Sequence, residues 1–209
     1  MEVKRLLDNL QTEEIYGLIG NINLTTNNEN YGIVNDHKPE ITVKEYLKSE
    51  KSLSSLKMVL LDENIENKRI SECSESEIKR INLAKVLIEN KEYIVLDYFE
   101  KGLNKEEKEY FKRLFKKLAN TYHKTILIFT NDITFLWEIC KKIILVDEYM
   151  KINYINKEEY FNILDVIDKP DIIDIIDLIR EKGLKIENYK NEADLLKAIY
   201  RLKENKWNI

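Results

Sequence analysis

The sequence predicts an α/β protein in which helices flank a mostly parallel sheet, with a small helical appendage at the carboxyl end. Two observations support this fold class. Residues 93–96 form a short, almost wholly apolar run, as expected of a strand buried on both faces, and residues 15–20 and 125–129 form similar runs. Residues 74–88 and 104–122 have helical patterns, so helix and strand alternate through the centre of the chain.

Two capping patterns mark where these central helices begin. Ser74 is followed three residues later by Glu77, so that the hydroxyl and the carboxylate satisfy the first free backbone N–H groups of a helix. Asn104 and Glu107 repeat this arrangement. We therefore expect one helix to begin at Ser74 and the next at Asn104.

The residue that follows the central strand is acidic. Asp97 lies at the expected carboxyl end of residues 93–96. In open α/β sheets ligands bind at that edge, and carboxylate oxygens are suitable ligands for magnesium. Asp97 is therefore a candidate magnesium ligand and also a candidate turn former.

The composition argues against several classes of protein. The 209 residues carry a formal net charge of -4 with acidic and basic residues interspersed, so there is no basic footprint for nucleic acid. No apolar segment approaches the length of a membrane span, and the amino terminus lacks the apolar run of a signal peptide. Cys73 and Cys140 make no disulfide framework, which also favours the cytosol. His37 and His123 lie in no spaced cluster with cysteine, so we expect no transition-metal site.

The carboxyl-terminal segment has a pattern of its own, which divides the chain into residues 1–155 and residues 156–209. Pro170 is tolerated in the first turn of a helix that Gly183 ends, and a second helix is expected from about Asn191.

The apolar residues of the first helix, Ile172, Ile175, Ile176 and Ile179, are expected along one side of it. Those expected to point inward from the second helix are Leu195, Leu196, Ile199 and Leu202. If the segment serves assembly, Ile172, Ile176 and Leu195 should lie partly on an exposed apolar patch. The alternative is that both helices pack on their own domain.

A longer pattern connects the central features. Arg80 lies one turn into the capped helix, residues 83–85 read Leu-Ala-Lys, Asp97 follows the apolar run, and residues 102–104 read Gly-Leu-Asn. In this order and spacing, residues 73–104 resemble the ATP-binding cassette (ABC) ATPases, in which an LSGGQ signature loop, its helix, the Walker B strand, a catalytic glutamate and a D-loop follow one another. The resemblance implies a shortened P-loop NTPase-like fold.

The resemblance implies roles for individual residues, several of which have unsuitable side chains. Ser74 lies in the counterpart of the signature loop, Asp97 stands for the Walker B aspartate, and Asn104 stands for the D-loop aspartate. Tyr98 and Asn131 occupy the positions of the catalytic glutamate and of the histidine that contacts the terminal phosphate. A phenol is neutral near pH 7 and an amide carries no charge, so we expect this chain not to hydrolyse ATP by itself.

The counterparts of the other nucleotide-binding loops also depart from the family. Gly20 ends the counterpart of the Walker A strand, but residues 21–30 contain neither glycine nor lysine, and Thr26 stands where the lysine belongs. Asp36 replaces the glutamine that helps to coordinate magnesium. We therefore expect residues 21–30 to be a polar loop and not a phosphate cradle. The helical subdomain of the family corresponds to about residues 42–75.

The carboxyl-terminal segment is similar to the helical extension of energy-coupling factor ATPases, a branch of the ABC superfamily in which the extension helps two ATPase subunits to pair. The resemblance implies a non-catalytic or regulatory subunit that partners an intact ABC ATPase and a transmembrane component, at the inner face of the cell membrane. No cofactor is assigned, and ATP with magnesium is expected only if the chain still binds nucleotide.

Two alternatives remain open at this level. The chain could be an ATP-binding protein, or an ATPase, whose nucleotide contacts have been rebuilt on other residues. It could also be a soluble scaffold without a transporter partner.

Overall fold

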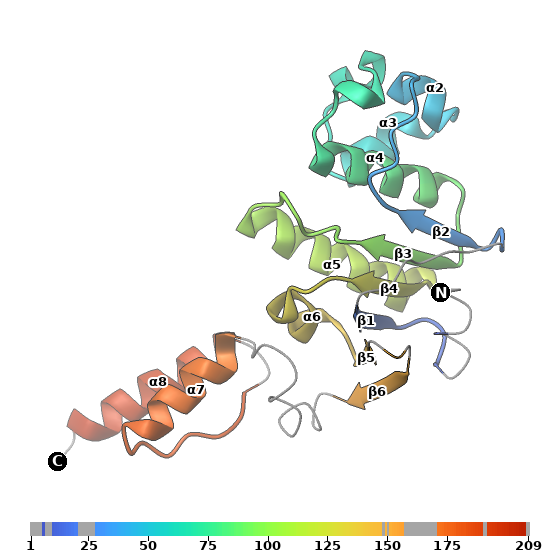
Figure 1. Cartoon of the computed structure of the whole chain (residues 1–209). Helices are drawn as coiled ribbons and strands as arrows, with labels where there is room; N and C mark the ends of the chain where they lie inside the picture. Colours follow the sequence, from blue (N-terminus) through green and yellow to red (C-terminus); the bar gives the residue numbers. More distant parts are fainter. Residues whose placement is uncertain are drawn as a thin grey trace.

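The central sheet has six strands in the order β2-β3-β4-β1-β5-β6 (Figure 1). Along β2-β3-β4-β1-β5 every neighbouring pair is parallel, and β6 is antiparallel to β5. This confirms the predicted mostly parallel sheet. The computed structural model describes residues 6, 10–20, 28–147, 149, 151–156, 171–189 and 192–207. Side chains are described up to residue 202.

The strands are short and each predicted apolar run forms one of them. Their bounds are β1 Ile15–Ile19, β2 Tyr31–Val34, β3 Tyr93–Asp97, β4 Thr125–Phe129, β5 Lys142–Val146 and β6 Ile152–Asn156. The α-helices are α2 Val43–Leu47, α3 Ser52–Met58, α4 Glu75–Ile88, α5 Lys105–Tyr122, α6 Ile133–Ile139, α7 Asp171–Glu181 and α8 Glu192–Trp207. Two 3₁₀ turns, Glu63–Asn67 and Ile70–Glu72, connect α3 to α4.

Strand β3 is buried on both faces, as its apolar run predicts. Ile94 and Leu96 belong to a large cluster that includes α4, α5 and α6, whereas Val95 belongs to a second cluster on the opposite face. All three side chains are at most 1% exposed. Complete burial of such a side chain contributes about 1.5–3 kcal/mol, so the central strands contribute a large part of the folding free energy.

Both predicted capping boxes are present. Ser74 Oγ accepts a 3.2 Å hydrogen bond from the backbone N–H of Glu77, and the Ser74 N–H donates to the Glu77 carboxylate at 2.7 Å. Asn104 and Glu107 make the same two contacts, each at 2.9 Å. Each box satisfies donors that the helix itself leaves free, so the positions of α4 and α5 follow from local sequence.

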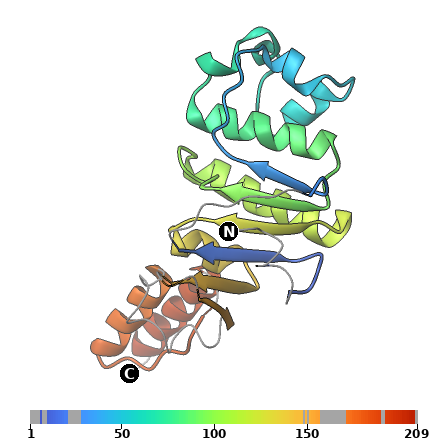
Figure 2. The same ribbon diagram turned by 45° about the vertical axis from the view of Figure 1, so that its right-hand side comes forward.

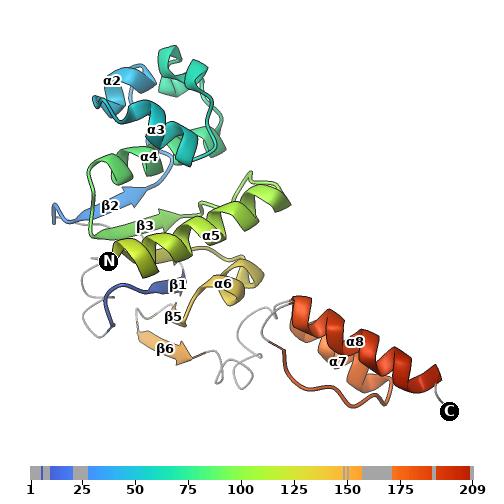
Figure 3. The same cartoon turned by 180° about the vertical axis from the view of Figure 1, so that it is seen from behind.

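The helices that are not directly on the sheet lie at its two ends. Helices α2 and α3 lie beyond β2, while α7 and α8 lie side by side beyond the β6 end, as Figures 1 and 3 show. Figure 2 shows the parallel strands pointing one way between these two ends. Within the part of the chain that the structure describes, no helix combines the length and apolar character needed to cross a membrane.

The terminal helices correct one prediction. Ile172, Ile176 and Leu195 were expected partly on an exposed patch if the segment serves assembly, but they are 4%, 1% and 2% exposed and belong to the main core cluster. These three residues therefore follow the alternative, in which the helices pack on their own domain. The side chains that face solvent are instead Ile175, Leu178, Leu196 and Tyr200, at 40%, 56%, 53% and 66%. The expectation that Leu196 points inward was therefore wrong, and Ile175 does not share the burial of Ile172 and Ile176. The main cluster covers only the narrow stripe of α7 that contains Ile172 and Ile176, and Ile175 lies outside it.

Candidate functional site

The candidate site lies at the carboxyl end of β3, where Asp97 is the last residue of the strand. The next residue, Tyr98, has a φ of 46°, which is unfavourable for a side chain of this size. Its backbone is held from two sides: the Tyr98 N–H donates to the carbonyl of Phe129 at 2.8 Å, and the carbonyl of Tyr98 accepts from the Lys79 ammonium at 2.7 Å. The strand end is thus joined both to β4 and to α4.

Asp97 and Asp36 lie at the same edge, as the sequence pattern implied. Strand β2 pairs with β3 so that Val34 is opposite Leu96, and Asp36 follows two residues after Val34. Burial raises the pKa of the Asp97 carboxyl, the charge of Lys79 opposes that rise, and the negative charge of Asp36 adds to it. The two carboxylates therefore repel each other at this edge.

Tyr98 and Asn131, which the resemblance placed at the positions of the family's catalytic glutamate and histidine, lie near each other. Burial and the charges of Asp97 and Glu100 raise the pKa of the Tyr98 phenol, and the nearby Asn131 side chain partly offsets that rise. The Tyr98 ring packs edge-on against Phe129 at 4.9 Å between ring centroids. The phenol is thus held neutral at pH 7, and an amide is its partner.

Ser74 and Asn104 serve their own helices. The Glu77 carboxylate lies on the first turn of α4 and accepts from the Ser74 N–H, and Lys68 also donates to it at 3.3 Å. Burial alone would raise the pKa of Glu77, but these hydrogen bonds hold it below its ordinary value. A carboxylate of the chain thus occupies the position where an N-terminal helix turn would bind an anion.

Gly20 has a packing role at the end of β1. Its φ is +149°, and a Cβ added there would lie 2.5 Å from the carbonyl oxygen of Val146. Only glycine allows this approach between the ends of β1 and β5. The residues expected to form the counterpart of the phosphate loop, Thr25, Thr26 and Asn27, lie outside the described residues.

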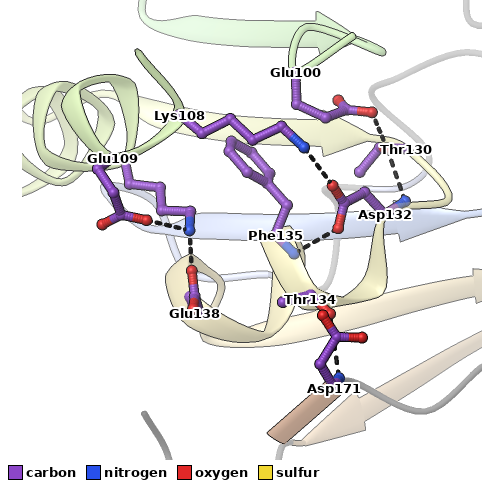
Figure 4. Close-up of polar contacts among 10 residues, drawn as sticks. Glu100, Lys108, Glu109, Thr130, Asp132, Thr134, Phe135, Glu138 and Asp171 are labelled. Atoms are coloured by element: carbon purple, nitrogen blue, oxygen red, sulfur yellow. Dashed lines mark hydrogen bonds and ion pairs between the residues drawn. The ribbon is translucent and has the colours of Figure 1, made fainter. Parts of the chain in front are cut away.

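A buried acidic network that sequence reasoning missed lies beside the site (Figure 4). Glu100 is 4% exposed, and its Oε1 accepts a 2.5 Å hydrogen bond from the Thr130 hydroxyl. Thr130 Oγ in turn accepts from the backbone N–H of Asp132 at 3.0 Å, and Asp132 pairs with Lys108 at 2.9 Å. Because Glu100 lies in a charged stretch between β3 and α5, its sequence context resembles a solvated loop.

Lys79 is the second residue that sequence reasoning missed. It follows the core residue Ile78 on α4 and is 6% exposed. The only sequence signal was its position beside Ile78, on the stripe that faces the sheet. No group of three or more His, Cys, Asp or Glu side chains is gathered for a metal ion within the described parts of the chain.

The arrangement of strands and helices matches solved structures of one family. MJ0796, a bacterial ABC transporter cassette solved as a dimer, superposes with a TM-score of 0.61 over 71% of this chain and 88% of its own, at 18% identity. CbiO1 from Clostridium perfringens, part of the ABC transporter complex CbiONQ, superposes with a TM-score of 0.57 over 76% and 83%, also at 18% identity. The chain has the fold of an ABC ATPase cassette.

Curated relatives of this cassette are ATP-binding proteins of ABC transporters. The energy-coupling factor protein EcfA2 of Spiroplasma kunkelii is 28% identical over 158 residues, 72% of this chain and 52% of the relative. EcfA2 of Mycoplasma capricolum is 26% identical over 138 residues, and the zinc import protein ZnuC of Ehrlichia chaffeensis is 31% identical over 114 residues. These matches span about half the length of each relative. No protein-family model matches the cassette.

Proposed function

We propose that this cassette is a non-catalytic subunit that pairs with an intact ABC ATPase in a transporter of the energy-coupling factor type. The observation that carries the proposal is that a phenol, Tyr98, follows Asp97 at the end of β3, with the amide of Asn131 near it. These two positions correspond to the base and the phosphate-contacting histidine of the family, and both side chains are neutral. The cassette would bind at the inner face of the membrane through its partners, one of which is a transmembrane component.

The missing groups make hydrolysis by the isolated chain too slow to matter. Burial and two nearby carboxylates raise the pKa of the Tyr98 phenol, so the hydroxyl keeps its own proton at pH 7. A protonated phenol cannot accept a proton from water. Loss of one general base or one charge-stabilising donor costs a factor of about 10² to 10⁴ in rate. Here both positions are changed, and Thr26 stands for the lysine of the phosphate loop.

The apolar surface on the terminal helices supports pairing. Leu178 on α7 and Leu196 and Tyr200 on α8 are each more than half exposed. Large apolar side chains exposed to water on two adjacent helices (Figures 1 and 2) are candidates for a surface that is covered in an assembly. The tail in this proposal therefore contributes both to its own core and to contact with another subunit.

Two measurements test the proposal. Steady-state phosphate release by the purified chain with ATP and magnesium should equal the background without protein, and turnover that Asp97→Ala abolishes would favour a rebuilt nucleotide site. Light scattering of the chain mixed with an intact ATPase subunit of the energy-coupling factor type should show a heterodimer.

The matched variants for the pairing measurement are Leu178→Asp and Tyr122→Asp. Leu178 is 56% exposed on α7 and Tyr122 is 52% exposed on α5, so both changes add one charge to an exposed helical position. Leu178→Asp should abolish the heterodimer and Tyr122→Asp should leave it intact. A chain that stays monomeric in the mixture, or two variants with equal effects, would favour a scaffold without this partner.

A further inference from the structure

Acidic side chains converge around the carboxyl end of β3 with little solvent to separate their charges. Asp97 is half-buried at the strand end, and Glu100 is buried three residues later. Burial raises the pKa of both carboxyl groups, and Asp36 adds a further negative charge beside Asp97. Buried carboxylates that share a site are unfavourable unless a cation compensates them.

The chain supplies a cation from α4. Lys79 is only 6% exposed, and its Nζ donates a 2.7 Å hydrogen bond to the carbonyl oxygen of Tyr98. That carbonyl belongs to the residue directly after Asp97. Burial lowers the pKa of the Lys79 ammonium, while the charges of Glu100, Asp97 and Glu75 favour its protonated form and Lys101 opposes them.

The geometry points to Lys79 as the resident counter-charge of this edge, in the place of a bound divalent cation. Lys79 is in this view a positioning residue: its ammonium holds the Tyr98 carbonyl and compensates Asp97 and Glu100, so the loop between β3 and α5 is ordered without magnesium or nucleotide. The inference does not depend on the proposed pairing, because it concerns charges within one chain.

The donor set fits a magnesium ion poorly. Magnesium takes six oxygen ligands in near-octahedral geometry. At this edge the position after Asp97 carries a phenol, one oxygen of Glu100 accepts from Thr130, and a buried ammonium lies close by. A dication beside an ammonium would add repulsion to the cost of dehydrating the metal.

The first test is a thermodynamic cycle between Lys79 and Asp97, read by thermal unfolding. Lys79→Gln should lower the melting temperature by roughly 6 to 20 °C, because it leaves partly buried carboxylates without their cation. Asp97→Asn should raise the melting temperature of Lys79→Gln by clearly more than it changes that of the wild type. This difference between the two backgrounds is the expected signature, since neighbouring groups couple and independent ones add.

Two controls sharpen the cycle. Lys101→Gln removes a positive charge from the same loop, but Lys101 is exposed and its ammonium lies 3.8 Å from the centre of the Tyr98 ring. It should have a small effect that is the same with and without Asp97→Asn. Lys79→Arg keeps the charge and should melt close to the wild type.

Three results would overturn the inference. The first is a cycle in which Lys79→Gln and Asp97→Asn simply add. The second is stabilisation of the wild type by millimolar magnesium chloride that Asp97→Asn removes. The third applies if Lys79→Gln fails to fold: the double variant Lys79→Gln/Asp97→Asn should then fold again, and its failure to do so would count against a charge role.

Discussion

The hydroxyl of Thr130 donates a 2.5 Å hydrogen bond to the carboxylate of Glu100, which joins the turn after β4 to the loop after β3. Both side chains are buried, and Glu100 Oε2 has no hydrogen-bond partner within the described part of the chain. An acid in such a position makes stability depend on pH in a predictable direction.

The first prediction concerns the pH dependence of stability. Burial raises the pKa of Glu100 above its ordinary value, so the folded state binds the proton more tightly than the unfolded state. The stability that this group contributes is complete below the unfolded pKa and is lost as the pH rises through the folded pKa. Relative to the wild type, Glu100→Gln should therefore gain stability across that range, by about 1.4 kcal/mol for each unit that the pKa is raised.

Chemical denaturation at a series of pH values measures this difference. Thr130→Val serves as the comparison because it removes the hydrogen bond that stabilises the ionised form. In Thr130→Val the pKa of Glu100 should be higher than in the wild type. The fall of stability with rising pH should therefore continue to a higher pH than in the wild type. A Glu100→Gln difference that is flat across the acidic range would contradict the prediction.

The second prediction concerns the first turn of α4. Replacing Glu75 and Ser76 by glycine introduces the small residues that the resemblance expects in the signature loop, but it should weaken the fold. Two glycines in a helical turn cost about 0.5–1 kcal/mol each, and the loss of Glu75 removes a charge that suits the helix dipole. The midpoint of chemical denaturation should fall, and an unchanged or higher midpoint would show that this turn is not limiting.

The third prediction concerns Gly20. Gly20→Ala should destabilise the protein by about 1–3 kcal/mol, because the new methyl group would meet the Val146 carbonyl in a backbone conformation that side chains avoid. Gly183→Ala is the matched control, since Gly183 has a φ of +76° but nothing within 4 Å of an added Cβ. Equal effects in thermal unfolding would mean that the approach to Val146 is not tight.

The fourth prediction separates the two sides of α7. Ile173 is 1% exposed and Leu178 is 56% exposed. Ile173→Ala should cost about 2–5 kcal/mol, as large-to-small changes in a core do, whereas Leu178→Ala should change stability by no more than about 0.5 kcal/mol. If denaturation of the isolated chain shows little effect of Ile173→Ala, the terminal helices contribute little to the core.

Much of the fold could be predicted from local sequence. The helices begin at Ser74 and Asn104 because each capping box links residues only three positions apart. The apolar run before Asp97 forms a doubly buried strand because its side chains exclude water on either face. The order of these elements was also sufficient for the resemblance to ABC ATPases, which the solved structures confirm.

The outward face of α7 could not be predicted in the same way. Ile172, Ile175 and Ile176 are identical in type, and periodicity alone places all three on one stripe. Which of them is covered depends on the element that lies against the helix. Ile175 is the one left exposed.

The sequence by itself determined where the strands and capped helices lie, since those properties depend on residue type and short spacing. The assignment of Tyr98 and Asn131 to the places of a glutamate and a histidine is what the resemblance to the family implies. Only the tertiary structure decided that Tyr98 contacts Asn131, that Lys79 is buried against the Tyr98 carbonyl, and that Glu100 is an interior acid. The physical reason is that each of these contacts joins residues 19 to 33 positions apart, at the point where parallel strands and α4 meet. A charged side chain has no local signal for burial, because its burial depends on the partners that the fold brings to it.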